Sequence, residues 1–158
     1  MIITEKEPTV ATLTINTLIK GPVVITDEDL VTFMTPLFGF SGNLKRWYIY
    51  QTQSGPSYWL QSIDDEKVGF CLLAPFKAGL DPDIELNTND VADIGAANAS
   101  DIDVYSMVVL DSDPTKTRTN LRAPILVCRT TRLAKQVVLN DAKLPIKFYL
   151  RDLKPQGR

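Results

Sequence analysis

The sequence of 158 residues contains no histidine and only two cysteines. Without an imidazole the chain cannot assemble a Ser-His-Asp triad or a Cys-His nucleophile, and it lacks a common zinc ligand. Two sulfurs cannot form a four-thiolate metal site. Cys71 and Cys128 each lie in a short apolar run, so we expect two buried, reduced thiols. The missing residue types exclude several classes of enzyme and metalloprotein.

Long hydrophobic runs and nucleotide-binding motifs are also missing. No stretch approaches the ~18 apolar residues of a membrane span, and the charged residues 1–7 lack the apolar core of a signal peptide. Neither GxGxxG nor GxxxxGK[ST] occurs, and no serine lies in a GxSxG motif. We therefore expect a cytoplasmic protein without a membrane segment, a cofactor or an enzyme active site.

Short segments with period-2 alternation dominate what is present. They are rich in β-branched and aromatic residues and are separated by turns that contain Gly, Pro or Asp. These strand-like segments are residues 10–19, 23–25, 46–51, 57–63, 68–74, 102–110, 123–130, 136–139 and 146–150. One short helix is expected near residues 88–95, with Gly95 at its end. Its N-cap is expected to be Asn87, Thr88 or Asn89.

This pattern predicts an all-β fold in one domain. Closure of an antiparallel sheet limits exposed strand edges, so we expect a single antiparallel β-barrel-like domain of about nine or ten short strands. The barrel domain is expected at residues 12–151, after an N-terminal extension at residues 1–11 and before a C-terminal tail at residues 152–158.

The net charge of −2 hides a strong asymmetry along the chain. Residues 78–115, which we call the acidic block, contain nine acidic side chains and no basic one. Residues 116–158, the basic block, contain eleven basic side chains and two acidic ones. Such asymmetry is typical either of a partner surface or of strand faces that complement each other after folding.

Two features could carry catalysis or nucleic-acid recognition. The turn Asp64-Asp65-Glu66 could supply the paired carboxylates of a hydrolase, although acids at a strand end are more often solvated. In the basic block, Lys and Arg side chains precede Phe148 and Tyr149. A β-barrel with such residues could bind single-stranded nucleic acid by phosphate neutralisation and stacking. The sequence alone leaves both alternatives open.

Three motifs stand in order along the chain. Residues 59–65 read WLQSIDD, residues 120–127 read NLRAPILV, and residues 135–141 read KQVVLND and are followed by Pro145-Ile146. With this order and spacing the chain resembles the flagellar assembly factor FliW family from about Ile15 to Leu150. The early loop departs from the family pattern, since residues 33–40 keep only Phe33, Gly39 and Phe40 of it.

The resemblance implies a non-enzymatic cytoplasmic protein that binds flagellin and the RNA-binding carbon storage regulator CsrA. Export of flagellin would free the assembly factor, which would then bind CsrA and relieve its repression of flagellin translation. The same resemblance implies no cofactor, no direct contact with nucleic acid or membrane, and a monomer when free. The alternative function is a nucleic-acid-binding β-barrel protein that uses the basic C-terminal part.

Partner-binding residues are expected on charged and on apolar surfaces. Opposite potentials steer association and repel RNA, so Asp101, Asp103 and Asp111 of the acidic block are expected to face the basic regulator. An amphipathic flagellin helix is expected to dock near Phe38 and Phe40. The expected partner-binding residues in the three motifs are Asp64, Asp65, Asn120 and Asn140. No catalytic, cofactor-binding or metal-binding residue is expected.

Overall fold

The computed structural model describes residues 11–40, 44–52 and 55–154. Within these residues, eleven strands and one α-helix alternate with short 3-10 turns. The strands are β1 (Thr12–Thr17), β2 (Gly21–Thr26), β3 (Leu30–Phe33), β4 (Arg46–Gln51), β5 (Ser57–Ser62), β6 (Gly69–Leu73), β7 (Ile102–Val109), β8 (Arg118–Thr119), β9 (Ile125–Cys128), β10 (Leu133–Gln136) and β11 (Phe148–Tyr149). The expected extension at 1–11 and tail at 152–158 lie outside the described residues, apart from residue 11 and residues 152–154.

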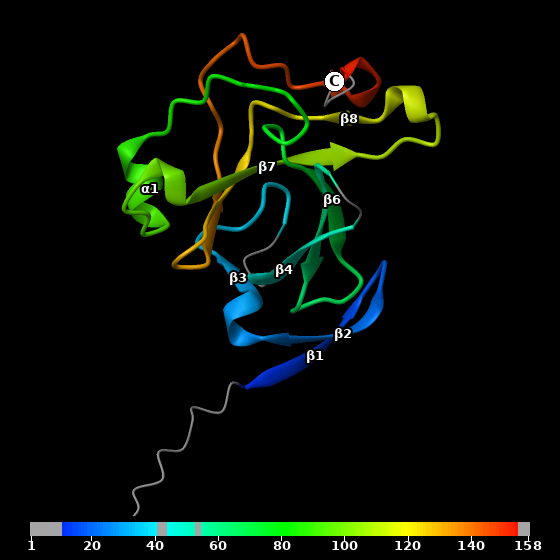
Figure 1. The fold of residues 1–158 in the computed structure, drawn as a ribbon, viewed down its shortest axis with the longest axis vertical. Helices are drawn as coiled ribbons and strands as arrows, with labels where there is room; N and C mark the ends of the chain where they lie inside the picture. The colour runs from blue at the N-terminus through cyan, green and yellow to red at the C-terminus, as the bar shows by residue number, and fades with distance from the viewer. Residues whose placement is uncertain (1–10, 41–43, 53–54, 155–158) are drawn as a thin grey trace, which may run out of the picture.

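Seven of the strands form a closed barrel (Figure 1). Their order is β7-β6-β5-β4-β3-β10-β9, and the ring closes because β9 pairs with β7 over Ile102–Tyr105. The second half of β7 pairs with β8, which in turn pairs with β11. The prediction of an all-β, barrel-like fold is therefore confirmed.

One pairing in the barrel is parallel, although the sequence predicts an antiparallel sheet. Strands β3 and β10 run in the same direction, with Thr32 opposite Leu133 and Phe33 opposite Ala134. About one hundred residues separate these strands in the chain. No hairpin turn therefore sets their relative direction, and a parallel pair can form through a long connection.

Three strand positions differ from the prediction. Strand β3 (Leu30–Phe33) forms between the expected strands 23–25 and 46–51, where none was predicted. The segment 111–122, expected to be a connection, contains the short strand β8. The strand expected at 136–139 is instead β10, which ends at Gln136. The backbone N–H groups of Val137 and Leu139 donate to the carbonyls of Pro124 and Arg122, in the irregular segment between β8 and β9. The chain therefore stays extended after β10 but leaves the regular ladder.

The short helix forms where the sequence predicts it. Helix α1 covers Thr88–Asp93, and the side chain of its N-cap Asn87 accepts a hydrogen bond from the Asn89 backbone N–H at 2.8 Å. Gly95 follows with φ of +68°, a conformation that favours glycine after a helix. No helix among the described residues is long and apolar enough to cross a membrane.

Two of the three core clusters of the described residues share strand β9. Ile125 and Val127 pack inside the barrel with Trp47 and Leu60. Leu126 and the free thiol Cys128 point to the outer face, where half-buried side chains from residues 84–96 cover them. All four residues of β9 are therefore buried. The other free thiol, Cys71, is half-buried, so the expectation of buried thiols is confirmed fully for one of the two.

Strands β1 and β2 form a separate two-stranded sheet below the barrel in Figure 1. Its inward face buries Ile15 and Ile25. The backbone N–H of Leu18 donates to the Gln61 side chain at 2.9 Å, and the Asn16 amide donates to Glu66 at 2.9 Å. These contacts join the hairpin to the end of β5.

Candidate partner-binding surface

The first motif, residues 59–65, directs its central polar side chain into the protein. Gln61 is fully buried. Its Oε1 accepts hydrogen bonds from the Leu18 N–H and the Trp59 indole N–H, at 2.9 and 3.1 Å. Its Nε2 donates to backbone carbonyls, those of Ser62, Glu66 and Val68. Buried backbone N–H and C=O groups require hydrogen-bond partners. The Gln61 amide is the partner of several such groups where the β1–β2 hairpin meets the barrel.

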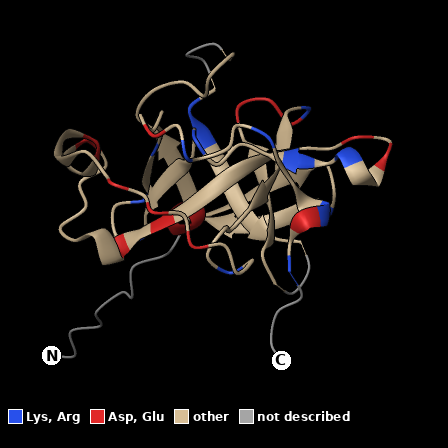
Figure 2. Ribbon diagram, turned by 90° about the horizontal axis from the view of Figure 1, so that it is seen from above, with Lys and Arg blue, Asp and Glu red and all other residues tan. Residues whose placement is uncertain are grey.

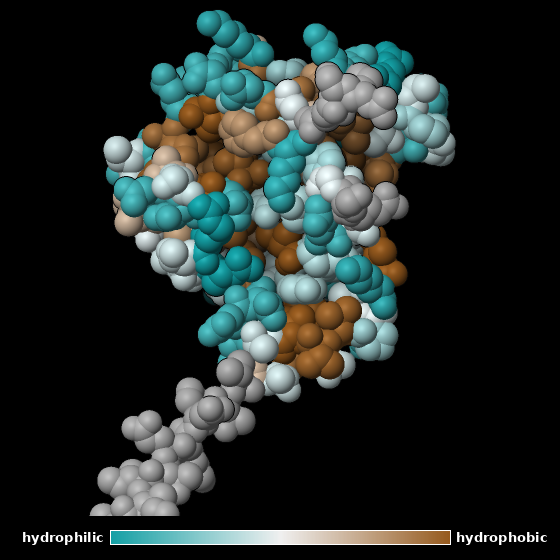
Figure 3. All heavy atoms as spheres, in the orientation of Figure 1, coloured by the Kyte–Doolittle hydropathy of each residue, from teal (hydrophilic) through white to brown (hydrophobic). Residues whose placement is uncertain are grey.

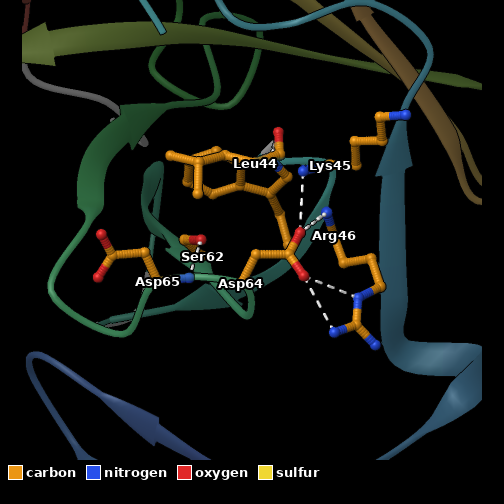
Figure 4. Close-up of polar contacts among 7 residues, drawn as sticks. Leu44, Lys45, Arg46, Ser62, Asp64 and Asp65 are labelled. Carbon is orange, nitrogen blue, oxygen red and sulfur yellow. Dashed lines mark hydrogen bonds and ion pairs between the residues drawn. The ribbon is translucent and has the colours of Figure 1, made fainter. Parts of the chain in front are cut away.

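Asp64, near the end of the same motif, bonds to the start of β4 (Figure 4). Its carboxylate accepts the backbone N–H groups of Lys45 and Arg46, each at 2.9 Å, and pairs with the Arg46 guanidinium at 3.0 Å. Burial raises the pKa of this carboxyl, but the two N–H donors and the guanidinium lower it more, so the net pKa lies below its ordinary value. Asp64 thereby holds the start of β4 against the end of β5.

The other acids of this turn also contact their own chain. The Asp65 side chain accepts the Lys67 N–H at 3.1 Å, and its backbone N–H donates to the Ser62 hydroxyl at 3.0 Å. Glu66 accepts the Asn16 amide. A hydrolytic carboxylate pair would need groups free to meet substrate, and this geometry gives the turn a structural use instead.

The second motif forms the irregular link between β8 and β9. Asn120 accepts the Arg122 backbone N–H through its side-chain oxygen at 2.9 Å. The Arg122 guanidinium donates to the carbonyls of Leu144 and Ala142, at 2.9 and 3.1 Å. The motif therefore fixes the loop 141–145, which follows the third motif.

The acidic and basic blocks interleave in part. Four acids of the acidic block pair with bases of the basic block. The pairs are Asp90 with Lys135 (2.7 Å), Asp93 with Lys135 (2.9 Å), Asp103 with Arg129 (2.7 Å) and Asp111 with Arg118 (3.8 Å). The hydrogen bonds that Lys135 donates to the carboxylates of Asp90 and Asp93 raise the pKa of Lys135. Three of the eleven bases of the basic block thus pair with acids of the acidic block within the fold.

Of the remaining acids of the acidic block, Asp83 and Glu85 lie beside the start of α1, whereas Asp81 lies near Asp152 and Lys154 and Asp113 precedes the 3-10 turn Pro114–Lys116. Among the described residues, the acids of this block outside any ion pair are Asp81, Asp83, Glu85, Asp101 and Asp113. Along the extended segment 81–86 the exposed acids alternate with half-buried residues, of which Ile84 and Leu86 pack against the outer core. Figure 2 shows acidic ribbon segments on the left of the view, the side on which α1 lies in Figure 1. This arrangement leaves negative charge exposed on that side.

A surface hollow of about 550 Å³ lies between this acidic segment and the chain after β10. Its lining residues are Asp83, Glu85, Leu86, Asn87, Asp90, Val138, Leu139, Asn140, Asp141, Lys143 and Leu144. Hydrophobic atoms lie between hydrophilic ones over this part of the surface in Figure 3. Val138 is 66% exposed there. We call this feature the hollow.

The two phenylalanines expected to meet flagellin have different surroundings. Phe38 is 52% exposed, and its backbone N–H donates to the Gln136 side chain at 3.0 Å beside the end of β10. Phe40 is half-buried and packs edge-on against Phe70, with ring centroids 5.0 Å apart. Of the two rings, Phe38 presents more surface to a partner.

The structure brings few of the expected partner residues together. Asp64 and Asp65 lie at the end of β5, whereas Asn140 lies in the hollow. Sequence reasoning did not select Asp83, Glu85 or Val138, which share the hollow with Asn140. The alternation of acidic and apolar residues at 81–86 is the sequence pattern that could have predicted one wall of the hollow. The described residues hold no group of three His, Cys, Asp or Glu side chains suited to a metal ion.

Comparisons with known proteins place this barrel in a family. The family model described as "FliW protein" matches residues 14–150. The chain is 31% identical over 130 residues to the flagellar assembly factor FliW of Caldicellulosiruptor saccharolyticus, covering 82% of this chain and 85% of that protein. It is 32% identical over 133 residues to the corresponding Clostridium botulinum protein, covering 84% and 94%.

A solved structure agrees with the sequence relatives. The crystal structure of the flagellar assembly factor FliW superimposes with a TM-score of 0.79 at 28% identity, covering 92% of this chain and 99% of that one. The chain therefore belongs to the FliW family of flagellar assembly factors. The resemblance carried by the three motifs is confirmed.

Proposed function

We propose that this protein binds flagellin and CsrA in the cytoplasm, and that its binding to CsrA relieves repression of flagellin translation. Membership in a family of flagellar assembly factors supports a role among flagellar proteins. The observation that carries the CsrA part is the exposed negative charge near α1, which suits a basic RNA-binding protein. The free protein acts as a monomer, without a cofactor.

The exposed acids favour a protein partner over nucleic acid. RNA carries phosphate charges, which the unpaired acids Asp83, Glu85 and Asp101 would repel. In the basic block, Arg118, Arg129 and Lys135 are held in ion pairs. Those bases have less positive charge to offer to phosphate.

Flagellin binding is assigned to the surface around Phe38. The ring is half exposed, while the neighbouring Leu37 is fully buried and fixes the segment to the barrel core. An exposed aromatic ring on a fixed backbone makes a good anchor for the apolar face of a helix. Asp103 and Asp111 are already paired within the chain, so Asp101 is the one acid, of the three first expected to face CsrA, that lies outside the ion pairs of the described residues.

The experiment uses purified components. Binding of this protein to flagellin and to CsrA is measured separately by calorimetry, and an RNA mobility shift is measured at physiological salt. We expect both proteins to bind and RNA not to shift with this protein alone. Addition of the protein should restore translation of a CsrA-repressed flagellin reporter. Binding to RNA but to neither protein would contradict the proposal.

A matched pair of variants tests the flagellin surface. Phe38→Ser should weaken flagellin binding at least about tenfold, because truncation of an interface anchor commonly costs more than 1 kcal/mol. Phe76→Ser is the control, since Phe76 is similarly exposed (49% against 52%). Equal affinity of both variants for flagellin would reject the assignment.

A further inference from the structure

We propose that the hollow between residues 83–90 and 138–144 binds a short basic segment of a protein partner that carries an aliphatic anchor residue. The inference rests on the proposed function, because CsrA is the basic partner in that proposal. It assigns the contact to one place on the surface. It also assigns that contact to residues other than Asp101, Asp103 and Asp111.

Charge is the first argument for this occupant. Four acids and one base, Lys143, line the hollow. Asp90 is already bonded to Lys135 at 2.7 Å, but Asp83, Glu85 and Asp141 take part in no ion pair among the described residues. Three carboxylates around a concave surface focus negative potential there. A segment with Lys or Arg side chains complements that potential.

The apolar floor is the second argument, and it is independent of charge. Val138 is two-thirds exposed, although the residues on both sides of it, Val137 and Leu139, are buried. Leu86, Leu139 and Leu144 complete the apolar lining. A free cation or a phosphate chain would gain nothing from these side chains, whereas an aliphatic side chain flanked by bases would bury them.

The walls of the hollow are held in place before a partner arrives. Lys135 ties the wall at α1 to β10 through Asp90 and Asp93. Arg122 ties the opposite wall to the β8–β9 link through the Leu144 and Ala142 carbonyls. A fixed site loses less conformational entropy on binding than a mobile one. The Asn140 amide, exposed on the same wall, could bond to the backbone of an entering segment.

The test is a binding titration of purified CsrA and purified flagellin against matched double variants. Asp83→Asn with Glu85→Gln removes two charges from the hollow. Asp27→Asn with Glu28→Gln removes the same charges from exposed residues outside its lining. We expect the first variant to bind CsrA about tenfold more weakly at low salt, and the control to bind it within about twofold of the parent.

A second variant removes the most exposed apolar side chain of the hollow, that of Val138, without changing its charge. Val138→Ser should weaken CsrA binding about threefold to tenfold at low and at high salt, because the lost contact is apolar. Thermal unfolding confirms that each variant folds, and flagellin binding should stay unchanged in both hollow variants.

Other outcomes would overturn the inference. If both hollow variants bind CsrA like the parent, the hollow is not the contact, although the proposed function stands. If they lose flagellin and keep CsrA, or lose both equally, the hollow does not select the basic partner. If the parent itself binds flagellin but not CsrA, that part of the proposed function fails and the inference fails with it.

Discussion

The 59–65 motif and the hollow use polar side chains in opposite ways. In the motif, Gln61 and Asp64 bond to backbone groups of neighbouring segments, and its two acids and the following Glu66 each contact their own chain. In the hollow, Asp83 and Glu85 are exposed and outside any described ion pair. The 59–65 motif therefore stabilises the barrel, whereas the hollow, which includes Asn140 and Asp141 of the third motif, leaves acidic side chains available to a partner.

The largest change in the free energy of unfolding is expected from a substitution within the 59–65 motif. Gln61→Leu should destabilise the protein by about 3 kcal/mol, because it leaves buried carbonyls and N–H groups without partners. It should also loosen the β1–β2 hairpin, which the Leu18 N–H joins to Gln61. Chemical denaturation measures the change in free energy of unfolding.

Gln51→Leu is the matched control for that change. Gln51 is exposed, and its amide donates to the Gly55 carbonyl at the surface. We expect a change within about 0.5 kcal/mol there. Equal effects at the two glutamines would show that burial of Gln61 does not govern stability.

A smaller loss of stability, which depends on pH, is expected when Asp64 is replaced. Asp64→Asn should cost about 1 kcal/mol near neutral pH, since a partly exposed carboxylate loses charge-assisted hydrogen bonds. The folded-state pKa of Asp64 lies below its unfolded value. Its contribution is therefore present above the unfolded pKa, about 3.9, and is lost as the pH falls through the folded pKa.

Denaturation at several pH values measures this contribution. The stability difference between the parent and Asp64→Asn should be constant from about pH 5 to 8 and shrink below about pH 4. Asp65→Asn is the control, because an amide oxygen can still accept the Lys67 N–H. A stability difference that grows on acidification would contradict the role assigned to Asp64.

Much of the fold can be predicted from local pattern, and the failures have a common cause. The strand at 46–51 and a helix N-cap at Asn87, Thr88 or Asn89 depend on neighbouring residues, and both predictions are confirmed, with Asn87 as the cap. The parallel β3–β10 pair and the two-residue strand β8 depend on partners far along the chain. No local pattern contains that information.

The candidate site was harder to predict for a similar reason. The charge blocks are visible in the sequence, but which acids pair with bases depends on the approach of α1 to β10. Asp103 and Asp111 look as available as Asp83 in the sequence, although only the first two meet an arginine. The hollow itself joins segments about fifty residues apart.

Hydrogen exchange of the protein with and without CsrA tests this account most directly. Residues 59–68 should exchange equally in both states, because their polar groups are already bonded within the fold. Residues 81–90 and 138–144 should exchange more slowly in the complex, because the hollow is covered. Protection at 59–68 without protection of the two hollow segments would contradict the account.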